Sequence, residues 1–324
     1  MNNIAIVGAG QLGSRYLQGL ARIDIPINIQ VVDTNDKSLD LAKERYFQLP
    51  FNSNVRSISF HKRIDDLNHV LDLIILATNA DHRFGITREL LTTKSIKYLI
   101  LEKVLFQRLD EYNQIEKLLK KHDVPCWINH PRRLYPFYQS LKENLKSEKQ
   151  LNFNVQGGNW GLACNGLHFI DLISFLVDSD KLTIDTDYLN DKIYQSKRPG
   201  YIEIQGLLSG KIGENVFTLY SNEEPGLHII SIASDHFRYV IDEAKGMIWE
   251  SSVYDQWQWK EKHEKIVFNQ SEISHNIVEE IIRTGSSGLP TYEAAAALHK
   301  PFISSLLEYY NQISNETHVR LPIT

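Results

Sequence analysis

The sequence contains little cysteine, no long apolar run and no concentration of positive charge. Its two cysteines, Cys126 and Cys164, are too few for a disulfide framework and their spacing matches no zinc motif, so we expect a reducing compartment and no metal site. Charged residues interrupt every apolar stretch before it reaches the roughly 18 to 20 residues that a membrane-spanning helix needs. A membrane protein is therefore not expected.

Charge and the first residues narrow the choice of partner and location. Asp and Glu outnumber Lys and Arg by 40 to 35, and the cations are dispersed, so the chain lacks the basic surface of a nucleic-acid-binding protein. Met1 leads almost directly into an apolar segment, without the basic region and cleavage site of a secretory signal. The expectation is a cytoplasmic protein that acts on a small molecule.

Short apolar segments rich in Ile, Val and Leu alternate with amphipathic segments up to about residue 129. This alternation is typical of strand and helix units in a parallel sheet whose strands are buried on both faces. Leu12, Tyr16 and Leu20 share one helical face, as expected of a helix that covers such a sheet. The predicted strands cover residues 4–7, 29–32, 58–60, 71–77, 98–101 and 125–128. The pattern predicts an α/β fold whose N-terminal domain, residues 1–128, is a doubly wound parallel sheet.

Residues 129–324 show a different pattern and are predicted to form a second α/β domain. A strong helix near residues 166–177 precedes predicted strands at 201–208, 216–220, 228–232, 237–241 and 246–249. Turns such as Ser209-Gly210 separate these strands and favour a largely antiparallel open sheet. A closing helical region is predicted after Pro290 with Thr291 as its N-cap, and Pro301 should kink or divide it.

A glycine-rich turn, residues 8–13, joins the first predicted strand to the first predicted helix. Gly8 allows the tight turn, Gly10 lets the backbone approach a pyrophosphate, and Gly13 lets helix and strand pack closely. Gln11 and Leu12 open the helix, whose unpaired N–H groups attract phosphate. The turn predicts a Rossmann dinucleotide-binding domain, and the alternative is an ordinary glycine turn.

The second predicted strand ends at Asp33, in the position of an acid that binds the adenosine ribose. A carboxylate there repels a 2′-phosphate, and no Arg occurs among residues 34–36, so NAD is favoured over NADP. Thr78 and Asn79 follow the fourth strand, where small polar residues would line a nucleotide crevice. An ordinary turn would look much the same at these two positions.

Glu102 and Lys103 end the fifth strand, at the edge where open α/β sheets bind ligands. With the glycine turn, this pair resembles the Gfo/Idh/MocA family of sugar and cyclitol oxidoreductases, whose Glu-Lys-Pro motif lies here, although Val104 replaces the proline. Further similarity at residues 129–136, 157–172 and 289–291 extends the resemblance over nearly the whole chain. The resemblance implies that both side chains lie at the cofactor and that the Lys103 ammonium contacts the reacting hydroxyl, where it can stabilise an alkoxide. A surface ion pair is the alternative.

The stretch 157–172 resembles the family's substrate-side helix, which implies that His168 is a catalytic base or substrate ligand. Cys164, Asn165 and Asp171 are predicted to contact substrate beside it. With Asn165 as N-cap, His168 would lie in the first turn, where the helix dipole favours the neutral imidazole that a base requires. The family often has an acid at the position of Cys164, so another acid replaces it, the substrate differs, or activity is lost. A structural histidine is the alternative.

Arg132, Tyr135 and Trp160 complete the predicted substrate side. A guanidinium binds carboxylates and phosphates bidentately, so Arg132, with Arg133 beside it, could recognise an acidic sugar or a nucleotide sugar. Alternatively, at least one of these arginines ties the two domains together. Tyr135 and Trp160 could stack on a sugar ring or be buried aromatics of a domain interface.

Together these features predict an NAD-dependent oxidoreductase that transfers a hydride between the nicotinamide and a hydroxyl or carbonyl of a sugar, cyclitol or nucleotide sugar. Residues 129–324 would bind the substrate and, as the resemblance implies, form a homodimer or homotetramer through their sheet. The motifs also resemble a subgroup seen with surface-polysaccharide and acidic-sugar biosynthesis. Two alternatives stay open: an NAD-binding sensor or regulator that has lost turnover, and a biliverdin-reductase-like enzyme.

Overall fold

The computed structural model describes residues 1–324 and divides into two compact units. The first unit comprises Met1–Phe106, Asp110–Asn129 and Phe268–Glu293, and the second comprises Gln107–Leu109, His130–Val267 and Ala294–Thr324. The chain thus leaves the first unit next to the predicted domain boundary. Its return to the first unit at Phe268 was not part of the prediction.

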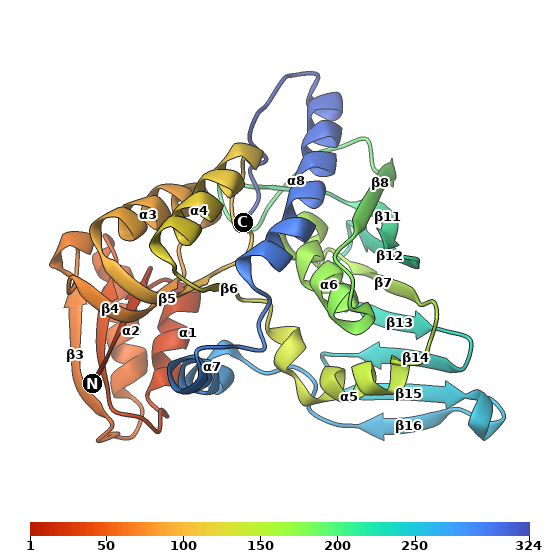
Figure 1. Cartoon of the computed structure of the whole chain (residues 1–324). Helices are drawn as coiled ribbons and strands as arrows, with labels where there is room; N and C mark the ends of the chain where they lie inside the picture. The colour runs from red at the N-terminus through yellow and green to blue at the C-terminus, as the bar shows by residue number, and fades with distance from the viewer. The chain divides into compact units, whose positions relative to one another are not determined.

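The first unit is built on a six-stranded parallel sheet in the order β3-β2-β1-β4-β5-β6 (Figure 1). Its strands are β1 (Asn2–Val7), β2 (Ile27–Val32), β3 (Val55–His61), β4 (Val70–Leu76), β5 (Ser95–Leu101) and β6 (Cys126–Ile128). Ile6 is in register with Val31 of β2 and Ile75 of β4, and all three side chains are buried. Burial of both faces is what the apolar strand pattern predicted, so the doubly wound sheet is confirmed.

Helices cover both faces of this sheet. They are α1 (Gln11–Leu20), α2 (Asp36–Phe47), α3 (Ala80–Thr93), α4 (Leu109–His122) and α7 (Gln270–Thr284), with a short helix η1 (Ile64–Asp66). Figure 1 shows α3 and α4 on one side of the sheet and α1, α2 and α7 on the other. The chain therefore winds outward in both directions from the β1–β4 pair, and the loops that follow these two strands meet at the switch point where open α/β sheets bind ligands.

The α7 helix belongs to the first unit although it lies far along the chain. It begins with a capping box in which Asn269 and Glu272 each bond the backbone of the other. It packs against α1 at Gly19, where an added Cβ would lie 2.6 Å from the Cβ of Ser274. The close approach of these two helices therefore depends on a residue without a side chain.

The second unit is built on an eight-stranded sheet in the order β16-β15-β14-β13-β7-β12-β11-β8. Its strands are β7 (Asn152–Gly158), β8 (Leu182–Leu189), β11 (Gly206–Ile212), β12 (Asn215–Asn222), β13 (Ile229–Ala233), β14 (Phe237–Asp242), β15 (Met247–Ser252) and β16 (Lys260–His263), and β9 (Tyr194–Gln195) pairs separately with β10 (Ile202–Glu203). Only β7 and β12 pair in parallel, so the predicted, largely antiparallel sheet is confirmed. The prediction did not include β7, β8 or the exposed β16.

The remaining helices are η2 (Pro131–Leu134), α5 (Pro136–Leu145), α6 (Leu162–Val177), η3 (Val253–Asp255) and α8 (Tyr292–Ser314). The α6 helix packs against β11 and β12. The α8 helix begins directly after Thr291, and Pro301 lies inside it without dividing it. The alternative prediction that Pro301 divides this helix in two is wrong, since the helix continues beyond the proline. Phe302 and Ile303, which follow it, are buried and hold this part of the helix in the core. None of the helices combines the length and the apolar character needed to cross a membrane.

Candidate functional site

A cavity of about 1220 Å³ lies at the carboxyl ends of β1, β2 and β4 in the first unit. Five of the predicted cofactor contacts line it, namely Gly8, Gly10, Asp33, Thr78 and Asn79. The other predicted contacts, Gln11, Leu12, Gly13, Glu102 and Lys103, are not among the residues that line it. The loops after three neighbouring strands thus form one hollow at the switch point of the sheet.

The three glycines of the turn have three different local geometries. Gly8 has a φ of 94°, and a Cβ there would lie 3.0 Å from the backbone of Thr78. A Cβ at Gly13 would lie 1.8 Å from the carbonyl oxygen of Gly8, so only glycine allows α1 to approach β1 this closely. A Cβ at Gly10 would meet no atom within 4 Å. The turn therefore needs Gly8 and Gly13 for its own packing, whereas Gly10 leaves space beside the backbone open.

Asp33 is held at this turn by the backbone. One carboxylate oxygen accepts from the Ala9 N–H at 2.7 Å and the other accepts from the Asn35 N–H at 2.8 Å. The carboxylate thus joins the glycine turn to the loop after β2, at the wall of the cavity. The side chain of Gln11, another predicted cofactor contact, is bound within the protein. Its oxygen accepts a hydrogen bond from Arg45 of α2 at 2.8 Å.

Two cations that the sequence analysis did not consider line the same cavity as Asp33. Lys62 and Arg63 follow β3, which lies next to β2 in the sheet. Lys62 pairs with Asp36 at 2.7 Å and Arg63 pairs with Asp65 at 2.7 Å. The residues that follow Asp33 in sequence, 34–36, include no Arg or Lys. The strand order, which places β3 beside β2, brings these cations to the same cavity.

Glu102 at the end of β5 is directed into the first unit. Its side chain is only 3% exposed and accepts hydrogen bonds from the Tyr16 hydroxyl and the Asn129 amide, each at 2.7 Å. Burial raises the pKa of this carboxyl, although the two hydrogen bonds and the charge of Arg83 oppose the shift. The carboxylate therefore links β5 to α1 and to the end of β6.

The loop that carries Lys103 is organised by a buried arginine of α3. Arg83 is 1% exposed, and its guanidinium donates to the backbone oxygens of Thr78, Val104 and Leu105. It therefore ties the loop after β4 to the loop after β5. Lys103 is half-buried and is joined to Val104 by a cis peptide bond, and Val104 itself is fully buried. Sequence analysis did not single out Arg83, because nothing in a helical segment marks a side chain that bonds distant carbonyls.

The α6 helix starts earlier than predicted. Its N-cap is Gly161, with a φ of 82°, and the Asn165 N–H already donates to the Gly161 carbonyl oxygen at 2.7 Å. The prediction that Asn165 is the N-cap is therefore wrong. His168 consequently lies beyond the first turn, where the field of the helix dipole has weakened, so the dipole argument for a neutral imidazole no longer applies. The Asn165 side chain donates to the Trp160 carbonyl oxygen at 2.8 Å.

An acid from a different strand lies at the start of α6. Glu203 of β10 accepts from the Ala163 N–H and from the Ile204 N–H, and the Cys164 side chain also bonds its carboxylate. Burial raises the pKa of Glu203, although these hydrogen bonds oppose the shift. Glu203 thereby provides the hydrogen-bond acceptor that Gly161 lacks. Its position in sequence offered no signal of this contact, because the contact is made only when β10 approaches α6.

His168 belongs to a row of three histidines in the second unit. Its ring lies edge-to-face with that of His130, with centroids 5.2 Å apart. The Nε2 atoms of His130 and His299 are 3.0 Å apart, and these two side chains are 1% and 0% exposed. At this distance one nitrogen donates and the other accepts, so at least one of the two rings is neutral. Neither His130 nor His299 was among the predicted site residues.

Both arginines after β6 are paired inside the second unit. Arg132 binds Glu243 through two hydrogen bonds, of 2.9 and 2.6 Å, and lies over the ring of Phe169. Arg133 binds Asp171 through two hydrogen bonds of 2.8 Å. These contacts do not tie the two domains together, which was the alternative prediction, because both partners of each pair belong to the second unit. The two predicted ligand contacts, Arg132 and Asp171, are each engaged by a protein partner.

The two predicted stacking aromatics differ in exposure. Tyr135 is buried, whereas Trp160 is half-buried. The Trp160 indole N–H donates to the Tyr220 carbonyl oxygen at 2.8 Å, and its ring meets Phe169 edge-to-face. These contacts fix the orientation of the indole against the sheet and α6.

The fold and the cavity define a class of protein. A parallel sheet with a glycine turn at its switch point, in a chain with a second, largely antiparallel sheet, is the architecture of a two-domain dinucleotide-binding protein. Residues 2–130 match the Gfo/Idh/MocA model, described as the oxidoreductase family with an NAD-binding Rossmann fold. The N-terminal domain therefore matches the NAD-binding domain of this family. No curated protein sequence matches it.

Solved structures of similar fold cover almost the whole chain. A Gfo/Idh/MocA family oxidoreductase from Vibrio cholerae has a TM-score of 0.71 and 17% identity over 97% of this chain and 100% of its own. The UDP-N-acetylglucosamine 3-dehydrogenase GnnA from Acidithiobacillus ferrooxidans has a TM-score of 0.67 and 12% identity over 94% and 95%. A super-repressor mutant of Gal80p from Saccharomyces cerevisiae has a TM-score of 0.73 and 15% identity over 98% and 99%. Identities this low establish the fold alone.

Proposed function

We propose that this protein is an NAD-dependent oxidoreductase that acts on a hydroxyl or carbonyl group of a sugar, cyclitol or nucleotide sugar. The geometry of the glycine turn is the observation that carries the proposal. Gly10 leaves open space at the start of α1, whereas Gly8 and Gly13 are tightly packed. Backbone N–H groups at that helix start suit a pyrophosphate. Asp33, fixed by two backbone N–H groups, suits the ribose hydroxyls. We therefore expect NAD to be preferred over NADP.

Bound NAD would supply hydride exchange at its nicotinamide ring. The Lys103 ammonium would stabilise the alkoxide that develops on the substrate oxygen or polarise a carbonyl. His168 would take the hydroxyl proton during oxidation and return it during reduction. Arg83 would hold the loop of Lys103 in place through its bonds to the Val104 and Leu105 carbonyl oxygens. The substrate would bind through the second unit.

Titration calorimetry with NAD⁺ and NADP⁺ on the wild-type protein and on Gly10→Val tests the cofactor site. The valine Cβ meets no protein atom within 4 Å, so the variant should melt like the wild type. Its side chain should fill the space needed by the pyrophosphate and weaken NAD⁺ binding by about 100-fold or more, on the order of 3 kcal/mol. Equal NAD⁺ affinity in both proteins would remove the glycine turn from the proposed site.

A non-catalytic sensor or regulator is the second candidate function. It is favoured by Cys164, which stands where the family often has an acid, and by the similarity in fold to Gal80p. Glu203 supports the enzyme instead, because it brings a carboxylate next to Cys164. Reduced-nicotinamide absorbance measured with a panel of sugars, cyclitols and nucleotide sugars separates the two. NAD⁺ binding without turnover of any of them would favour the regulator.

Three further expectations accompany the proposal. We infer a homodimer or homotetramer through the open face of the second sheet, a cytoplasmic location, and a role in surface-polysaccharide or acidic-sugar biosynthesis. The first can be measured by light scattering on the purified protein. A monomer at micromolar concentration would contradict it.

A further inference from the structure

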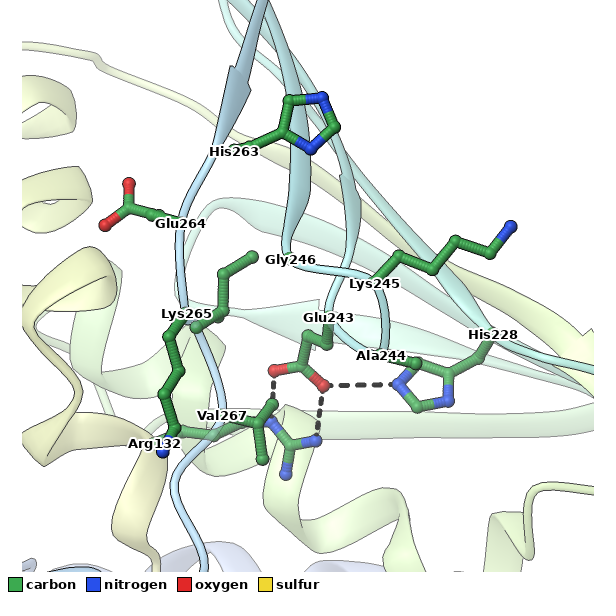
Figure 2. A pocket seen from close by; sticks show the side chains of 11 residues that line it. Arg132, His228, Glu243, Ala244, Lys245, Gly246, His263, Glu264, Lys265 and Val267 are labelled. Atoms are coloured by element: carbon green, nitrogen blue, oxygen red, sulfur yellow. Dashed lines mark hydrogen bonds and ion pairs between the residues drawn. The ribbon is translucent and has the colours of Figure 1, made fainter.

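Two cavities of the structure differ in how their walls are occupied. In the second unit, a cavity of about 720 Å³ is lined by side chains that bind one another, as Figure 2 shows for Glu243 with Arg132 and His228. In the first unit, the cavity of the glycine turn includes a helix position without a side chain, Gly85 of α3. Packing inside the protein does not account for that glycine.

Gly85 differs from the other glycines inside helices. Four glycines lie within α-helices, namely Gly13, Gly19, Gly85 and Gly166. At Gly13, Gly19 and Gly166 an added Cβ would lie 1.8, 2.6 and 3.2 Å from a neighbouring atom, so close packing explains the missing side chain. At Gly85 an added Cβ would meet no atom within 4 Å. Glycine is unfavourable in the interior of a helix, so Gly85 lowers the stability of α3 without any gain in packing.

The face of α3 that carries Gly85 lines the cavity. The lining residues of this helix are His82, Gly85, Ile86, Arg88, Glu89 and Thr92, whereas Arg83, Thr87 and Leu90 are buried on the opposite face. His82 lies three residues before Gly85 and Glu89 lies four residues after it, so both are its neighbours on the helix surface. A side chain is therefore missing in the middle of the face that lines the cavity.

The same cavity contains two apolar side chains away from the strand ends. Ile64 belongs to the segment that follows β3, and Ile86 is the neighbour of Gly85 on α3. The Asp33 N–H donates to the His61 carbonyl oxygen at 3.2 Å, which places the segment after β3 beside the end of β2. Both isoleucines are half-buried, and the rest of the lining away from β1, β2 and β4 is glycine or polar. The lining thus offers apolar contacts as well as the free space at Gly85.

We propose that Gly85 is a specificity-determining residue of this cavity, and that the space it leaves open accepts the adenine base of the dinucleotide. The inference rests on the proposed binding of NAD and adds the residue that makes room for its base. Adenine is attached to the ribose for which Asp33 is proposed, and Asp33 and Gly85 line one cavity. The flat faces of the base are apolar and suit contacts with Ile64 and Ile86. Without a side chain at position 85, a base of two fused rings fits against α3.

Titration calorimetry on the full chain with NAD⁺ and ADP-ribose compares the wild type with Gly85→Leu. The leucine should fill the space of the base and weaken the binding of both ligands by about tenfold or more, because both carry adenine. Leucine is a good helix former and its Cβ meets no protein atom, so the variant should melt no lower than the wild type. Unchanged NAD⁺ affinity in Gly85→Leu would overturn the inference. A loss for NAD⁺ that ADP-ribose does not share would also overturn it, since the space would then serve the nicotinamide half.

Two further variants are matched controls. Gly85→Ala adds a single carbon and should weaken both ligands less than Gly85→Leu does. Gln114→Leu adds an exposed leucine to α4, outside the lining, and should leave both affinities unchanged. An equal loss of affinity in Gly85→Leu and Gln114→Leu would contradict a role of Gly85. Wild-type protein that binds neither ligand would contradict the proposed function itself, whereas binding that Gly85→Leu leaves intact contradicts only the role of Gly85.

Discussion

At the scale of single residues, two buried glutamates have opposite electrostatic situations. Glu102 accepts hydrogen bonds from neutral groups, and burial raises its pKa. Glu243 has Arg132 as a bidentate partner, and its pKa is held low. The ionised form is thus costly at Glu102 and favourable at Glu243, although both carboxylates are almost completely buried.

Glu102→Gln should raise the midpoint of thermal unfolding at pH 7 by roughly 2 °C. The amide oxygen can still accept from Tyr16 and Asn129, and the buried charge is removed. Because the folded pKa lies above the unfolded value, stability is lost as the pH rises between the two. The gain should therefore vanish below about pH 4, where the carboxyl is protonated in both states. Unfolding followed by circular dichroism from pH 3 to pH 8 measures this.

Glu243→Gln is the matched variant, and it should lower the stability of the protein at pH 7. The change removes the carboxylate that pairs with the buried Arg132, which should lower the free energy of unfolding by about 3 to 5 kcal/mol at neutral pH. The stabilisation by Glu243 is present above its unfolded pKa and is lost as the pH falls through the lower folded pKa. The difference between wild type and this variant should thus shrink on acidification. If both Gln variants shifted stability in the same direction at pH 7, the electrostatic assignment would be wrong.

Lys103→Ala should lower kcat by about 100-fold or more while NAD⁺ affinity stays within roughly threefold of the wild type. The ammonium is proposed to act on the substrate oxygen, and Lys103 does not line the cavity of the glycine turn. Lys97→Ala, an exposed lysine on the same strand, is the control and should leave turnover unchanged. Undiminished turnover in Lys103→Ala would take Lys103 out of the mechanism.

At the scale of elements, the contact between α1 and α7 depends on Gly19. Gly19→Ala should destabilise the protein by roughly 1 to 3 kcal/mol, because its Cβ would lie 2.6 Å from the Ser274 Cβ. Adding Ser274→Gly should recover most of this loss, since the clash disappears. Urea unfolding of both single variants and of the double variant measures the coupling.

Gly85→Ala on α3 is the control for the same chemical change. An added Cβ at Gly85 meets nothing within 4 Å, so alanine should stabilise its helix by about 0.5 to 1 kcal/mol. Opposite signs for the two Gly→Ala changes would support the close packing of α1 and α7. A stabilising Gly19→Ala would contradict it.

At the scale of the whole molecule, the chain completes its first unit only at Glu293. A fragment of residues 1–129 lacks α7, whose buried face includes Ile277, Val278 and Ile281. We expect this fragment to expose the apolar surface of α1 and to unfold at least about 10 °C below the same fragment joined to residues 268–293 by a flexible linker. Equal melting temperatures would show that α7 contributes nothing to the stability of the unit.

The parallel sheet and the glycine turn could be predicted from the sequence, because both depend on local patterns. Apolar runs mark strands that are buried on both faces, and the spacing of Gly8, Gly10 and Gly13 follows from the turn between β1 and α1. The same local reasoning misplaced the start of α6, because the acceptor for its first N–H groups is Glu203, which lies on β10.

Which polar side chains lie together depends on how distant segments of the chain pack. This packing places Arg63 in the cavity of Asp33, joins Glu243 to Arg132, and sets His299 against His130. These pairs are separated by long stretches of chain, so no local propensity reports them. A polar group that leaves water needs a partner, but the sequence alone does not say which distant segment will supply it.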